Sequence, residues 1–94
     1  MREEPRHDEP RNLRIKRLKL RSMRRGIKEM DLILGGFAAA GLDQLSDADL
    51  ALYDEMLSEN DHDMYAWASG QVAAPDRFAE LMDHIVLNGG AIKR

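Results

Sequence analysis

The sequence predicts an all-α fold, a compact five-helix bundle with a disordered N-terminal tail, and three observations lead to this prediction. Apolar residues recur at helical spacing in five separate stretches. Residues that favour helix starts and stops stand between those stretches. No stretch alternates convincingly between apolar and polar residues, as a half-buried strand does. The chain has 94 residues, enough for one small core, and we expect a tail over residues 1–10 and a single helical domain over residues 11–94.

The N-terminal part of the chain is basic and contains the first predicted helix. Residues 1–10 combine two prolines with six charged side chains and a histidine, a composition typical of a disordered tail. Residues 11–25 follow as a helix with apolar contacts on two sides. These apolar residues are Leu13, Leu20 and Met23 on one side and Ile15 and Leu18 on the other. Gly26 then ends or breaks the helix.

A second helix, which we expect to be central to the core, follows Gly26 and ends at a C-terminal cap on Gly41. Its apolar positions at helical spacing are Ile27, Met30, Leu34 and Phe37. The Gly35-Gly36 pair weakens this helix by about 1 kcal/mol per glycine relative to alanine, unless close packing uses the space.

The third predicted helix begins at Ser46 and runs to about Glu59. Ser46 is the N-cap, with an acidic residue three positions on, and Leu45 can pack on Leu50 as a hydrophobic staple. The side chains expected to be buried are Leu50, Tyr53 and Leu57, and those expected to face water are Asp47, Asp54 and Glu55.

Two shorter elements complete the predicted bundle. Asn60 or Asp61 caps a fourth helix, which Gly70 closes. Its apolar face consists of Met64, Trp67 and Ala68, so we interpret the single tryptophan as a core residue rather than an exposed docking patch. Pro75 suits the first turn of a fifth helix that stops at residues 88–90. The apolar stripe of the fifth helix is Phe78, Leu81, Met82 and Ile85.

Composition argues against several classes of function. Cysteine is absent, so disulfides and thiolate zinc sites are excluded. The uncharged stretch of residues 32–42 is about half as long as the ~20 residues that a membrane-spanning helix needs, and no membrane insertion is expected. The N-terminus has no apolar signal core, and its acidic residues argue against a transit peptide. We therefore expect the bacterial cytoplasm rather than the mitochondrial matrix.

Catalysis has few candidate residues, and we expect no enzyme activity. The serines and histidines are scattered along the chain, and none forms an adjacent nucleophile–base pair. Asp61-His62-Asp63 could bind a metal, but it lacks the glycine and terminal glutamate of a calcium loop. A helix cap followed by a solvated acidic turn is the better interpretation.

Charge is distributed unevenly along the chain. Residues 1–28 contain 11 of the 14 basic residues, and residues 29–94 contain 13 of the 17 acidic residues. This asymmetry indicates either a partner that recognises charge or a basic helix neutralised by acidic neighbours in the same chain. Nucleic-acid binding is disfavoured, because the basic stretch has no aromatic residues for stacking and the whole chain carries a net charge of −3.

Charge, backbone freedom and helix boundary all change at the stretch Arg25-Gly26-Ile27-Lys28-Glu29. A helix-to-helix corner explains it, with Gly26 as terminator and Glu29 as a favourable charge in the next helix's first turn. The alternative is a surface where Gly26 lets another molecule approach the backbone closely.

The same stretch resembles the small helical assembly factors that promote covalent FAD attachment to the flavoprotein subunit of succinate dehydrogenase. The resemblance depends on three segments that together span about residues 14–78. They are Arg25-Gly26 with Glu29 and Asp31; Leu45-Ser46-Asp47; and Glu59-Asn60-Asp61-His62-Asp63-Met64-Tyr65-Ala66-Trp67 with Gly70.

The resemblance implies a five-helix bundle that binds its client without being the catalyst. It implies that Arg25 supplies a charged contact, that Gly26 allows close approach to the client near its FAD, and that Glu29 supplies a carboxylate there. Asp31 would give an adjacent polar contact or support the helix start. The implied partner is the succinate dehydrogenase flavoprotein, with fumarate reductase as a further candidate client. We expect a monomer that holds no FAD, metal or nucleic acid of its own.

Two other functions stay open on the sequence alone. One is a basic-helix nucleic-acid module or an antitoxin-like module, and bacterial members of the family have been labelled antitoxin-like. The other is a plain adaptor bundle.

Overall fold

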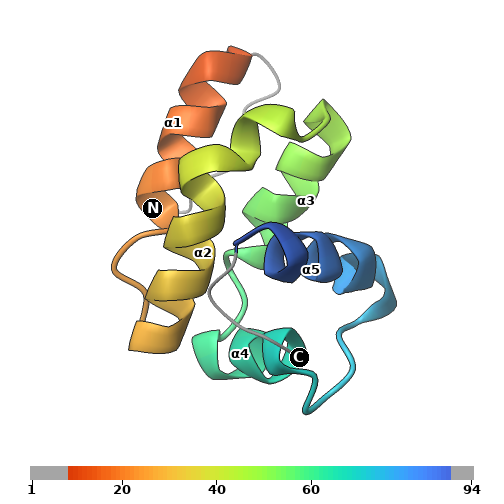
Figure 1. Ribbon diagram of the computed structural model, residues 1–94. Helices are drawn as coiled ribbons and strands as arrows, with labels where there is room; N and C mark the ends of the chain where they lie inside the picture. The colour runs from red at the N-terminus through yellow and green to blue at the C-terminus, as the bar shows by residue number, and fades with distance from the viewer. Residues whose placement is uncertain (1–8, 90–94) are drawn as a thin grey trace.

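The computed structural model describes residues 9–89, and this part of the chain contains five α-helices, one short 3₁₀ helix and no strand (Figure 1). The elements are α1 (Arg11–Arg21), α2 (Lys28–Ala40), η1 (Leu42–Gln44), α3 (Asp47–Met56), α4 (Asp61–Ser69) and α5 (Asp76–Gly89). The predicted all-α fold is confirmed. Most of the predicted tail, residues 1–8, lies outside the described residues, as does Gly90 of the predicted C-terminal stop.

Helix α2 is the centre of the bundle, as the sequence predicts. It packs against α1, α4, α5 and η1, and its largest contact is with α5 (Figure 1). The side chains that it buries are Met30, Ile33, Leu34, Phe37 and Ala38. Because these residues recur every three or four positions, they form one broad apolar face.

Four of the five aromatic side chains lie in the core, where they link helices to one another. Phe37 of α2 packs on Tyr53 of α3, with 5.9 Å between ring centroids, and Trp67 of α4 packs on Phe78 of α5 at 6.1 Å. Trp67 is 9% exposed, so its interpretation as a core residue is confirmed. The predicted apolar stripes of α3, α4 and α5 are all buried: Leu50, Tyr53, Leu57, Met64, Ala68, Phe78, Leu81, Met82 and Ile85.

The predicted helix caps are present at α3 and α4. The Ser46 hydroxyl accepts a hydrogen bond from the amide of Asp49, and Leu45 and Leu50 are both buried. The Asn60 side chain accepts from the amides of the second and third residues of α4. Gly70 ends α4 in the left-handed conformation, with φ of 84°. Each cap is a contact over a few residues, and for that reason local sequence predicts it.

Helix α3 ends at Met56, three residues before the predicted end. After Met56 the amides of Ser58 and Glu59 bond to carbonyls three residues back, so the last turn tightens from α to 3₁₀ spacing. The chain then becomes extended at Asn60, which must have non-helical backbone to cap α4.

The first helix differs most from the prediction, because α1 ends at Arg21 rather than at residue 25. The hydroxyl of Ser22 donates to the carbonyl of Leu18 at 2.7 Å and lies 2.6 Å from the hydroxyl of Tyr53. Ser22 is completely buried. This side-chain bond to the preceding turn, made beside a core tyrosine, anchors the C-terminal end of α1 in the core.

The two-sided apolar packing predicted for the first helix is wrong. Ile15 and Leu18 are buried, whereas Leu13, Leu20 and Met23 are 51%, 67% and 56% exposed. Only one side of α1 faces other helices, since no further element covers the opposite side among residues 9–89. None of the helices in this part of the chain is both long and apolar enough to span a bilayer.

Candidate partner-binding site

The predicted site residues lie at and beside the segment that joins α1 to α2, which we call the corner (residues 22–27). The chain reverses direction here through Arg24, whose φ of 55° places it in the left-handed region. Ile27 is extended and packs against the core, which starts α2 at Lys28. The residue with unusual backbone is therefore Arg24, and the expectation that Gly26 terminates the helix is wrong.

The guanidinium of Arg25 holds three elements together. Its Nε donates to Oδ1 of Asp61 at 2.9 Å, one terminal nitrogen to the carbonyl of Arg21 at 2.9 Å, and the other to the carbonyl of Leu57 at 2.8 Å. These acceptors belong to the last turn of α1, the end of α3 and the first turn of α4. The Arg25 side chain is only 13% exposed. Its charge is thus largely neutralised inside the protein, and its geometry is fixed by three hydrogen bonds.

Gly26 is needed at the corner because a carboxylate of the same chain lies against it. The amide of Gly26 donates to Oδ2 of Asp61 at 2.6 Å. A Cβ at Gly26 would lie 2.7 Å from that oxygen, closer than non-bonded atoms approach. The φ of Gly26 is not positive. Close approach therefore does explain the glycine, but here the approaching group belongs to the protein itself.

Asp61 holds the corner in place, a role that was not predicted from the sequence. One carboxylate binds both residues of the Arg-Gly pair, 35 and 36 positions earlier in the chain. Since Asn60 takes the cap of α4, the Asp61 side chain is free to point away from its own helix toward the corner. The signal was present in the sequence, because two cap candidates stood side by side and only one could be the cap.

Asp31 and Glu29 both lie in the first turn of α2, but their carboxylates have different surroundings. The Asp31 carboxylate accepts a hydrogen bond from the backbone amide of Arg25, so Asp31 supports the helix start, one of its two implied roles. Glu29 is exposed, and no described residue forms an ion pair or hydrogen bond with its carboxylate. Of the four predicted site residues, Glu29 is the one whose charged group is left entirely to solvent.

The arginines near α1 are neutralised by acids of the same chain. Their partners within the described range are Asp47 for Arg11, Glu9 for Arg14, Glu9 and Asp54 for Arg17, and Asp54 for Arg21. Asp54, expected to face water, is 13% exposed because it accepts from two arginines. Hydrogen bonding from Arg17 lowers the pKa of Glu9, and the two carboxylates raise the pKa of Arg17. The interpretation of a basic helix neutralised by acids of the same chain is confirmed for these arginines.

The other bases of this region have no such partners. Lys16, Lys19, Arg24 and Lys28 make no ion pair with any residue in the described range. No group of three or more potential metal ligands lies together between residues 9 and 89. The chemical features of this region are therefore a rigid corner, one exposed carboxylate and a set of free cations.

Comparison with known proteins gives a consistent set of relatives. Residues 16–87 match the model of the family described as the flavinator of succinate dehydrogenase. The chain is 44% identical over 85 residues to succinate dehydrogenase assembly factor 2, mitochondrial, of Meyerozyma guilliermondii. It is 40% identical over 77 residues to the Saccharomyces cerevisiae protein of that name and 35% identical over 95 residues to the Drosophila grimshawi protein.

The matches cover most of this chain but only part of each relative. They span 85%, 79% and 95% of the chain, and 63%, 48% and 65% of the relatives' own length. All three relatives are named as mitochondrial, which contradicts the expected location in the bacterial cytoplasm. That expectation depended on the first residues of the chain, and in a chain that spans only part of its relatives those residues do not determine the location.

Proposed function

Because this chain belongs to the family described as the flavinator of succinate dehydrogenase, we propose that it is an assembly factor for that enzyme. In this proposal it binds the flavoprotein subunit and promotes the covalent attachment of FAD. The observation that carries the proposal is the family match over residues 16–87, which includes the whole corner and every predicted site residue.

The proposed mechanism is positioning rather than catalysis by this chain. The client would supply both the FAD and the histidine that becomes covalently bonded to it. Holding two groups in reactive geometry lowers a barrier by several kcal/mol without any nucleophile from the assembly factor. A rigid corner suits this role, because Arg25 and Asp61 fix it through hydrogen bonds to three helices.

Each predicted site residue has a part in the proposal that fits its environment. Glu29 contacts the client directly, since its carboxylate is exposed and unpaired within residues 9–89. Gly26 is exposed and lacks a side chain, so the client can lie close to the backbone there. Arg25 and Asp31 mainly hold the corner in shape, and the small exposed part of Arg25 adds a charged contact.

Glu29→Ala is the sharpest test of the proposal. Losing an exposed charge in the first turn of a helix costs under about 1 kcal/mol of stability. We expect a nearly unchanged melting temperature, together with a loss of covalent flavin on the co-expressed flavoprotein subunit, measured by in-gel flavin fluorescence. Asp49→Ala is the matched control, because Asp49 is also an exposed acid in the first turn of a helix. Normal flavinylation with Glu29→Ala would remove Glu29 from the interface.

Gly26 variants test the client contact less cleanly than Glu29 does. Any side chain at Gly26 collides with Asp61 inside the protein, so a loss of flavinylation could follow from a distorted corner. Fumarate reductase flavoprotein can be tested in the same assay as a second client. Light scattering of the purified chain tests our proposal that it acts as a monomer.

A further inference from the structure

A shallow groove lies between α1 and α2 on the side of the bundle that carries the unpaired bases. It encloses about 440 Å³ and is lined by Lys19, Met23, Arg24, Asp31, Gly35, Ala38 and Ala39. We call these seven residues the α1–α2 groove. Met23 is 56% exposed beside the small side chains of α2. The groove thus combines an apolar surface with two cations that have no acidic partner within residues 9–89. Its one carboxylate, that of Asp31, accepts a hydrogen bond from the backbone amide of Arg25.

Gly35 keeps this groove open at a position where the fold does not require glycine. A Cβ at Gly35 would meet no atom within 4 Å, and the φ of Gly35 is not positive. Glycine inside a helix is less stable than alanine. The packing of α2 within the described chain therefore gives no reason for the glycine, whereas an open groove does.

We propose that the α1–α2 groove binds an acidic segment of the client flavoprotein, with one bulky apolar side chain of that segment seated on Met23 and the alanines. This rests on the proposed function. Charge complementarity favours an acidic segment, because unpaired Lys19 and Arg24 attract carboxylates. Burying the apolar surface between these two bases would further stabilise the complex.

The groove is continuous with the corner, so one client can cover both. Arg24 precedes the Arg25-Gly26 pair directly, and Asp31 lines the groove while its carboxylate holds the amide of Arg25. A protein seated on Gly26 and Glu29 therefore reaches the groove within a few residues.

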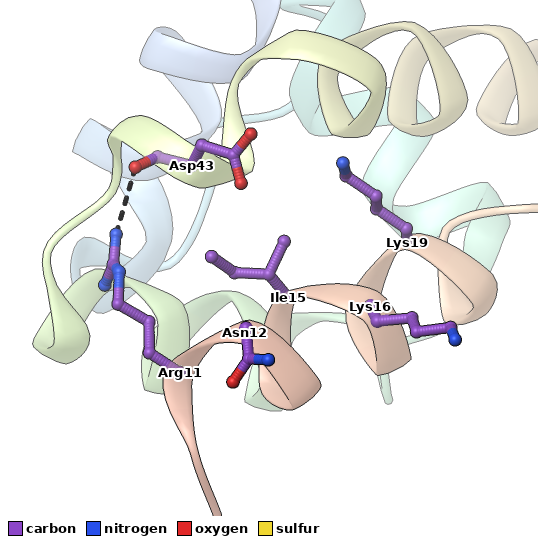
Figure 2. Close-up of a pocket in the computed structure, with 6 residues that line it drawn as sticks. All are labelled: Arg11, Asn12, Ile15, Lys16, Lys19 and Asp43. Carbon is purple, nitrogen blue, oxygen red and sulfur yellow. Dashed lines mark hydrogen bonds between the residues drawn. The ribbon is translucent and has the colours of Figure 1, made fainter.

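A second hollow continues the basic surface along α1. It encloses about 590 Å³, and Figure 2 shows its lining residues, among them Lys16, Lys19 and Ile15. Arg11 is turned toward the backbone carbonyl of Asp43, 3.0 Å away, so its charge is engaged. Lys19 lines both hollows, and the acidic segment extends from the groove toward Lys16.

Two variants test the groove in opposite ways, with the purified flavoprotein subunit as the binding partner. Gly35→Leu fills the groove and should weaken binding at least tenfold. Its melting temperature should be unchanged or higher, because leucine favours helix more than glycine does and its Cβ meets open space. Lys19→Glu with Arg24→Glu reverses the charge and should also weaken binding at least tenfold, with a smaller dependence on salt. Arg77→Glu is the control for charge, since Arg77 is an exposed base of α5 outside the groove.

The outcomes separate the groove from the proposed function. If both groove variants bind the flavoprotein like the unaltered chain while Glu29→Ala does not, the groove proposal is overturned and the proposed function stands. If the unaltered chain does not bind the flavoprotein, both are overturned. The same titrations with duplex and single-stranded oligonucleotides test nucleic acid as the alternative occupant of the groove. Tight binding that is lost in the charge-reversed variant would assign the groove to nucleic acid and overturn the proposal.

Discussion

The side of α1 that faces α3 and the side that faces away contain the same kind of residue in different states. Toward α3, Arg17 and Arg21 share the carboxylate of Asp54. On the other side, Lys16 and Lys19 have no acidic partner in the described chain. The basic residues of one helix therefore do not share one role. A base that faces an acidic residue of another helix is neutralised, and a base that faces solvent can bind a partner.

Residue type follows this division. The planar guanidinium of arginine can bond several acceptors at once, and the paired positions around α3 and α4 are arginines. Lysine keeps a compact, strongly hydrated charge that suits an open surface. Arg24 is the exception, an exposed arginine that lines the groove.

Among the substitutions that remove the acidic partner of an arginine, Asp61→Ala should have the largest effect on stability. It removes the acceptor of both Arg25 and Gly26 and leaves a mostly buried guanidinium with one bond fewer, so we expect a loss of about 2–4 kcal/mol. Chemical denaturation with urea measures it. Asp63→Ala is the control, an exposed acid of the same helix turn that should cost under about 1 kcal/mol. Equal losses for the two variants would show that the corner does not depend on Asp61.

The Asp61→Ala variant also tests why residue 26 is glycine. Gly26→Ala should destabilise the unaltered protein, because the new Cβ collides with Asp61. In the Asp61→Ala background that collision is gone, and the substitution should cost much less. The non-additivity of the two changes, read from a double-mutant cycle of urea denaturation, is the measurement. Additive costs would contradict the internal explanation for Gly26.

Asp54→Ala should cost about 1–3 kcal/mol, because Arg17 and Arg21 both lose a charged acceptor but each keeps another partner. Glu55→Ala is the control, since Glu55 pairs with exposed Arg77 on the surface and should cost under about 1 kcal/mol. If the two variants melt alike, the paired side of α1 contributes no more than an ordinary surface.

Acid should weaken the same network. Hydrogen bonding from Arg17 lowers the pKa of Glu9 below its ordinary value of 4.5. A lowered carboxyl pKa contributes stability that is present above the ordinary value and is lost as pH falls through the folded-state pKa. We expect the free energy of unfolding to fall below about pH 4.5 and to fall less steeply in Glu9→Gln. Equal slopes in the two proteins would contradict the Glu9 contribution.

Tyr53→Phe should cost about 1 kcal/mol, since it removes the hydroxyl that meets Ser22 while Ser22 keeps its bond to Leu18. Burial raises the pKa of Tyr53 to about 12. The folded state therefore resists ionisation, and stability should fall as pH rises above the ordinary tyrosine value of about 10. Tyr65→Phe is the control. Identical alkaline melts for Tyr53→Phe and the unaltered protein would show that the loss of stability at high pH does not come from Tyr53.

The smallest effect is expected on the free side of α1. Lys16→Gln with Lys19→Gln should change stability by under about 0.5 kcal/mol, because neither ammonium has a partner to lose among residues 9–89. Thermal melts measure the change. Arg17→Gln, on the opposite side of the same helix, is the contrast and should be clearly destabilising. A large loss from the lysine pair would break the comparison between the two sides.

Local sequence was sufficient for the helices and most of their ends. The Ser46 and Asn60 caps and the Gly70 stop each depend on residues within one or two turns of one another. The apolar spacing of α2 and α5 likewise predicts which face is buried, since a helix fixes which side chains point the same way.

Only the tertiary structure decided where α1 ends, why residue 26 is glycine and which bases are free. Ser22 meets Tyr53 across 31 residues, and Gly26 meets Asp61 across 35. Helical spacing relates side chains three or four residues apart, so it carries no information about which carboxylate a distant helix brings to an arginine. The sequence by itself determined five helices and the corner between the first two. Packing of those helices determined that Arg25 faces inward and that Glu29, Lys16 and Lys28 face solvent.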